Sequence, residues 1–136
     1  TSTPKADPSG DYAWQLFAKA EKLQPGALKV LDSKALQLTG GRDSAVAPTG
    51  RNTYGWVMEN NRADVFLTYC TNALLAQKQV PQLQVMQIPD ELAVAADYGL
   101  IVLKNAPAQA IGFSQFLLSE DGQDVLASYG FTPVTK

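Results

Sequence analysis

The stretch Asp7-Pro8-Ser9-Gly10-Asp11-Tyr12 leads directly into a run of helical pattern at residues 12–23. A proline, a small hydroxyl residue and a glycine before a helix form an N-terminus whose backbone N–H groups face outward, at the positive end of the helix dipole. Such an end can bind an anion, or Ser9 can simply cap its own helix. For this stretch taken alone, the capping interpretation is favoured.

Two further segments that contain small polar residues each lead into a predicted helix. They are Thr49-Gly50-Arg51 and Cys70-Thr71-Asn72. If the three helix starts converge, they present several N–H donors and few formal charges, which suits a small oxyanion. If they face different ways, they are three ordinary capped helices. Arg51 either contributes a fixed positive charge to the anion site or is simply a solvated arginine in the first turn of its helix. Tyr69 would either donate a hydrogen bond from its phenol or simply pack.

Helical and strand-like segments alternate along the chain. Three segments have the composition of strands, 63–69, 83–88 and 98–103, and the last is continuously apolar, as a buried strand is. Residues 38–50 are rich in Gly, Ser, Thr and Pro and are predicted to form a loop. This alternation predicts an α/β fold. The predicted helices are 12–23, 27–36, 51–60, 73–79, one after Asn105 with Pro107 in its first turn, and one from the cap Ser119 to Tyr129 with Gly130 at its C-terminal end.

The composition excludes several functional classes. The chain has 136 residues, of which 46% are hydrophobic, and a net charge of −2, which argues for one globular unit and against a broad nucleic-acid surface. No run approaches the ~18 apolar residues of a membrane span, so membrane insertion is not expected. With no histidine, the common general base and the usual catalytic pairs are absent, and we expect no enzymatic activity. The single cysteine, Cys70, is predicted to be a small buried residue.

Four segments in order give the chain a family resemblance. They are residues 6–13, 61–69, 97–103, and the group 116–119, 122–123 and 129–131. In this order and spacing, the chain resembles the periplasmic molybdate-binding proteins of ABC importers, within the type II solute-binding superfamily. The resemblance implies a three-layer lobe with a mixed sheet flanked by helices. It also implies a periplasmic or extracellular location.

The resemblance also implies which residues hold the anion. Ser9, with Gly10 beside it, supplies a backbone N–H group, and the hydroxyl of Tyr69 reaches the oxyanion. Arg51 or a direct neighbour supplies a third contact, at a point where the family often has an apolar residue. Thr68 stands where relatives with an octahedral site carry an acidic residue, so tetrahedral coordination of molybdate or tungstate is expected. No cofactor is implied, and no metal apart from the one at the centre of the oxyanion.

The resemblance implies a protein of two lobes, each with a core of its own, and such a protein is longer than this chain, so the chain is expected to be one part of it. By resemblance, residues 1–95 form the second lobe, and residues 96–136 form a hinge strand and C-terminal helices that return to the first lobe. The expected partners are the small oxyanion and the permease of an ABC importer. Apolar surface left by the first lobe would favour a homodimer or strand exchange.

A second hypothesis is a ligand-sensing or interaction domain of the same fold in a regulatory protein, because a fold does not determine a function. A third is an enzyme that uses the helix starts as an oxyanion hole. The lack of histidine and of a placed nucleophile disfavours the enzyme.

Overall fold

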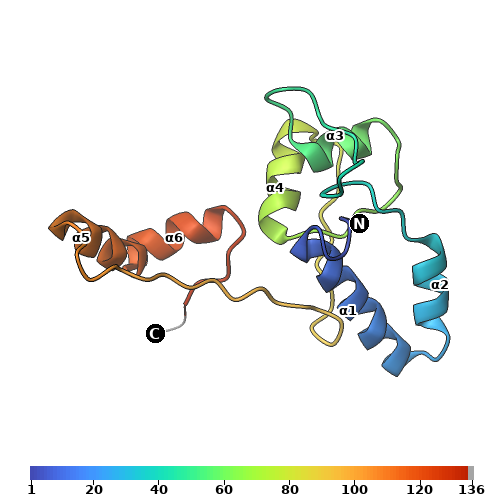
Figure 1. The fold of residues 1–136 in the computed structure, drawn as a ribbon, viewed down its shortest axis with the longest axis horizontal. Helices are drawn as coiled ribbons and strands as arrows, with labels where there is room; N and C mark the ends of the chain where they lie inside the picture. The colour runs from blue at the N-terminus through green and yellow to red at the C-terminus, as the bar shows by residue number, and fades with distance from the viewer. Residues whose placement is uncertain (135–136) are drawn as a thin grey trace. The chain divides into compact units, whose positions relative to one another are not determined.

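The computed structural model describes residues 1–134, and within them it contains helices and irregular segments but no β-strand. Three pairs of helices pack together in chain order, α1 with α2, α3 with α4, and α5 with α6 (Figure 1). Among these residues, the one strand-like contact is an isolated parallel bridge between Ser2 and Thr39. The helices are α1 (Pro8–Leu23), α2 (Ala27–Lys34), α3 (Thr53–Glu59), α4 (Cys70–Gln79), α5 (Ala108–Leu117) and α6 (Glu120–Ser128).

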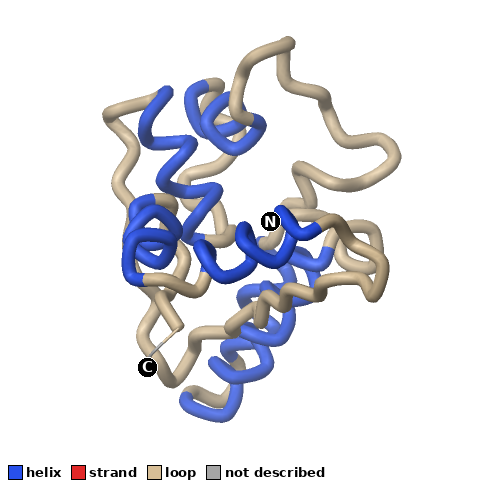
Figure 2. Tube along the Cα trace, turned by 90° about the vertical axis from the view of Figure 1, so that its left-hand side faces the viewer, coloured by secondary structure: helices blue, strands red, loops and turns tan. Residues whose placement is uncertain are grey.

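The expected α/β lobe with a mixed sheet flanked by helices is therefore wrong. Residues 63–69, 83–88 and 98–103, predicted as strands, run as irregular chain (Figure 2). Their β-branched and apolar residues suit an extended backbone, but a strand also needs a neighbour that pairs with its N–H and C=O groups. None of these segments has such a neighbour among the described residues.

The chain divides into two compact units, Thr1–Ala95 and Ala96–Lys136, which we call the N-terminal and C-terminal units. Their assignment to a second lobe and a returning segment stays a prediction. The segment 98–103 belongs to the C-terminal unit and is exposed, Ile101 by 86%, so the expectation of a buried strand there is wrong. No described helix is both long enough and apolar enough to cross a membrane.

The buried apolar residues lie in the N-terminal unit. On α1, Ala13 and Phe17 are buried, as the helical spacing predicts. Helices α3 and α4 approach closely at Gly55, where an added Cβ would lie 3.3 Å from Cγ2 of Val80 and 3.4 Å from the carbonyl oxygen of Ala76. Val57 and Val80 are the most buried large side chains of this unit. The pairing of these helices therefore supplies part of the apolar core of this unit.

All six predicted helices form within the described residues, with shifted ends. Helix α2 ends at Lys34 rather than at residue 36, and α3 is capped by Asn52, whose side chain accepts a hydrogen bond from the N–H of Gly55. Helix α6 begins at the predicted cap, because the hydroxyl of Ser119 accepts from the N–H of Gly122 at 3.3 Å. Gly130 follows α6 with φ of 91°, the left-handed conformation common after a helix.

Candidate functional site

Helix α1 starts earlier than predicted and has a different cap. Asp7 is the N-cap, with an extended backbone at φ −139° and ψ 124°, and its Oδ1 accepts a hydrogen bond from the N–H of Ser9 at 2.9 Å. Pro8 occupies the first turn, where its fixed φ suits a helix and no N–H group is lost. Ser9 therefore lies inside the helix, and its interpretation as the cap is wrong. Asp before Pro is a capping signal that the sequence did contain.

Ser9 joins a short chain of buried hydroxyl groups. Its Oγ donates to Oγ of Ser2 at 2.7 Å, and Oγ of Ser2 shares a hydrogen bond of 2.8 Å with Oγ1 of Thr39. All three residues are buried, and the backbone bridge between Ser2 and Thr39 lies at the same point. These bonds satisfy polar groups that would otherwise be costly to bury, and they tie the start of α1 to the loop after α2.

Gly10 has a packing role in this arrangement. A Cβ atom built on it would lie 2.6 Å from the backbone nitrogen of Pro4 and 2.7 Å from the carbonyl oxygen of Ser2. The N-terminal segment therefore crosses α1 at backbone contact distance, which only glycine permits. The structure does not place Gly10 on the lining of the cavity described below.

The second predicted contact, Tyr69, stands at the start of α4. It is the N-cap residue, with φ −67° and ψ 147°, and no side chain caps this helix. Its ring meets that of Tyr12 edge to face, with centroids 6.0 Å apart and an interplanar angle of 73°. Tyr12 follows Ser9 by three positions, so both lie on one face of α1. Tyr12 was not predicted as a site residue, although this spacing from Ser9 is visible in the sequence.

Ser9 and Tyr69 line one small cavity of about 50 Å³. This volume holds a few water molecules. The polar side chains on its lining carry no formal charge, and the remainder of the lining is apolar. The arrangement is suited to a small ligand held by hydrogen bonds rather than by ion pairs. The lining consists of Ser9, Tyr12, Ala13, Leu16, Leu67, Thr68, Tyr69, Ile88 and Val94.

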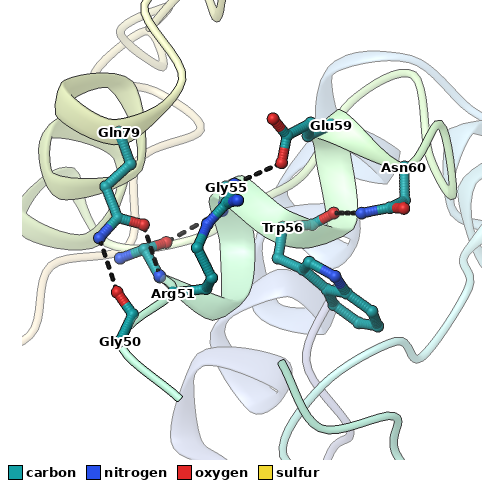
Figure 3. A network of polar contacts seen from close by, with 8 residues as sticks. Gly50, Arg51, Gly55, Trp56, Glu59, Asn60 and Gln79 are labelled. Carbon is teal, nitrogen blue, oxygen red and sulfur yellow. Dashed lines mark hydrogen bonds and ion pairs between the residues drawn. The ribbon is translucent and has the colours of Figure 1, made fainter. Parts of the chain in front are cut away.

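Arg51 is not part of this cavity. Arg51 lies two residues before α3, and its guanidinium forms an ion pair with Glu59, the last residue of that helix (Figure 3). Beside it, Gln79 of α4 accepts from the N–H of Asn52 at 2.6 Å and donates to the carbonyl oxygen of Gly50 at 3.1 Å. These contacts join the start of α3 to the end of α4. Arg51 lines a different cavity of about 250 Å³, together with residues 39–41, 44–47 and Thr53.

The structure thus brings two of the four predicted residues together. Ser9 and Tyr69 share a cavity, whereas Gly10 packs against the backbone and Arg51 pairs with Glu59. Cys70, predicted to be buried, is exposed, and its Sγ lies 3.7 Å from Oε1 of Gln87. Within residues 1–134, no cluster of three or more acidic, cysteine or histidine side chains could hold a metal ion.

Comparison with known proteins gives two matches. A family model described as bacterial extracellular solute-binding protein matches residues 1–132. The chain is also 42% identical over 133 residues to an uncharacterized protein of Pasteurella multocida (strain Pm70). That alignment covers 97% of this chain and 54% of the relative, so the chain spans about half the length of this curated relative. None of the solved structures compared with the chain gives a significant match.

Proposed function

We propose that this chain, which belongs to the family of bacterial extracellular solute-binding proteins, binds a tetrahedral oxyanion of the molybdate or tungstate type. Binding serves delivery to the permease of an ABC importer, in the periplasm or outside the cell, and involves no turnover of the ligand. Family membership supports capture of a solute, and the choice of an oxyanion comes from the site.

The observation that carries the proposal is the shared cavity of Ser9 and Tyr69. These residues stand 60 positions apart in the sequence, yet both line the same space, and each lies at the start of a helix. Helix starts favour anions through their dipoles and their N–H groups. The small volume and the uncharged polar lining favour a compact ligand bound by hydrogen bonds.

Isothermal titration of the chain with molybdate, tungstate, sulfate and phosphate tests the proposal. We expect heat of binding with molybdate or tungstate and less with the other two anions. Absence of heat with all four would overturn the proposal.

A Tyr69→Phe variant tests the position of the site. Removing a hydroxyl that bonds a charged ligand weakens binding by roughly tenfold or more. Tyr54→Phe is the matched control, because the Tyr54 ring packs against Phe66 at 5.2 Å between centroids and does not line the cavity. Equal affinities of the two variants would place the ligand elsewhere on the chain.

A further inference from the structure

Residues 87–94, which we call the strap, form one side of the small cavity described above. Ile88 and Val94 line the cavity from this segment, and both are half-buried. The other sides come from α1 and from residues 67–69, which lead into α4. The strap contains neither helix nor strand. Its place at the cavity therefore depends on a few individual bonds, and a segment held in this way opens at a low free energy.

Lys19 of α1 holds the strap near its C-terminal end. Its Nζ donates a hydrogen bond to the carbonyl oxygen of Ala93, the residue before Val94. Tyr12 and Leu16 line the cavity, and Lys19 follows Leu16 by three positions, so the three residues lie on one face of α1. The helix face that lines the cavity therefore also carries the side chain that bonds to the strap.

Two further contacts shape the strap. The N–H groups of Leu92 and Ala93 both donate to the carbonyl oxygen of Pro89 at 2.9 Å, which closes a turn within the segment. At the other end, Oε1 of Gln87 accepts from Sγ of Cys70, the first residue of α4, at 3.7 Å. A thiol is a weak donor, whereas an ammonium group is a strong one. The bond from α1 is therefore the stronger of the two side-chain contacts that hold the strap.

We infer that the strap gates the anion site, and that Lys19 is the positioning residue that keeps it closed. This inference rests on the proposed function. A ligand enters or leaves when the strap moves away from α1, and this movement breaks the bond between Lys19 and Ala93. Because that bond does not involve the ligand, it stabilises the closed strap equally with and without ligand. It therefore slows association and dissociation together and leaves their ratio, the Kd, unchanged.

Stopped-flow fluorescence of molybdate binding to Lys19→Met tests the inference. Methionine keeps an apolar side chain and removes the charged donor. We expect the rate constants of association and dissociation both to rise by about tenfold, the scale of one hydrogen bond to a charged group. The Kd should change by less than about twofold, because the closed strap is destabilised equally in both states. The matched control is Lys22→Met, which removes the same charge from an exposed position on the same helix and should leave both rate constants unchanged.

Hydrogen exchange at the Leu92 and Ala93 amides provides a second measurement that needs no ligand. We expect faster exchange in Lys19→Met than in the unaltered chain or in Lys22→Met, with exchange within α1 unchanged. Unchanged exchange at the strap, unchanged rate constants, or a loss of affinity caused by faster dissociation alone would overturn the inference, while the proposed function stands. If the unaltered chain binds no oxyanion, the proposed function fails together with the inference.

Discussion

At the scale of single residues, Glu21 shows how one exposed side chain defines a helix start. Its carboxylate accepts from the N–H of Gly26 at 3.0 Å and from the N–H of Leu28 at 2.9 Å, at the beginning of α2. These bonds, that from Gly26 first, lower the pKa of Glu21 from its ordinary value of 4.5. Because the pKa is lower in the folded chain, the stabilisation is present above pH 4.5 and is lost as the pH falls through the folded-state pKa.

We therefore expect Glu21→Gln to lower the melting temperature of the chain at pH 7. The deficit should shrink as the pH is lowered below 4.5, because the unaltered glutamate then loses its charge as well. Thermal unfolding followed by circular dichroism at a series of pH values measures both effects. Glu91→Gln, at another exposed glutamate, is the control and should leave the melting temperature at pH 7 unchanged. A deficit that stayed constant down to acid pH would contradict the role given to the Glu21 charge.

A second prediction at the scale of single residues concerns Gly10. A methyl group at this position meets backbone atoms of Thr3 and Pro4 at 2.6 Å, so the N-terminal segment has to move. Gly10→Ala should cost about 1–3 kcal/mol in the free energy of unfolding, as overpacking does. Urea unfolding measures this cost.

The control for Gly10→Ala is Gly112→Ala, on α5. Nothing lies within 4 Å of a Cβ built on Gly112, so alanine there should raise helix content, by up to about 1 kcal/mol of helix propensity. Far-UV circular dichroism follows that gain. A Gly10→Ala variant as stable as the unaltered chain would show that the N-terminal segment does not cross α1 as described.

At the scale of elements, the helices were largely predictable because their signals are local. Helical spacing on α1 predicts the burial of Ala13 and Phe17, and Ser119 and Gly130 mark the two ends of α6. The cap of α1 was misplaced because Ser9 was given the capping role that belongs to Asp7. Ser9 is instead held by Ser2 and Thr39, and nothing in the local sequence indicates that these residues meet.

The strands failed for a different physical reason. The composition of residues 98–103 indicates an extended backbone. A strand, however, must pair with a second segment, and the local sequence does not identify that segment. In the candidate site, too, the local sequence predicts some features and misses those that depend on contacts between segments. Ser9 was predicted at a helix start, as the structure has it, whereas Tyr69 was predicted to end a strand and is instead the N-cap of α4. The pairing of Arg51 with Glu59 follows from the packing of α3. A charge is therefore a weak guide to a site unless its nearest partner is known.

At the scale of the whole molecule, apolar burial is distributed unevenly between the two units. All the fully buried apolar side chains described belong to the N-terminal unit. In the C-terminal unit, most large apolar residues of the segment 98–103 and of helices α5 and α6 are substantially exposed, Leu103 by 73% and Phe113 by 60%. Exposed apolar surface on this scale is typical of an interaction surface.

We therefore expect the chain to self-associate through the C-terminal unit. Burying apolar surface is worth roughly 25 cal/mol per Å², but association also costs translational and rotational freedom, so the contact has to cover most of these side chains and not only a few. In sedimentation velocity, the mean mass should rise above the 14.6 kDa of one chain as concentration increases.

The double substitution Ile101→Lys and Leu103→Lys should shift the chain back to the mass of a monomer, because it places two charges on the exposed segment. Val46→Lys is the matched control. Val46 is 88% exposed, as Ile101 is at 86%, but it lies in the loop of the N-terminal unit. Association that persists in the double variant, or that Val46→Lys abolishes equally, would assign the contact to another surface. A chain that stays monomeric at all concentrations would show that this exposed apolar surface does not bind a second copy.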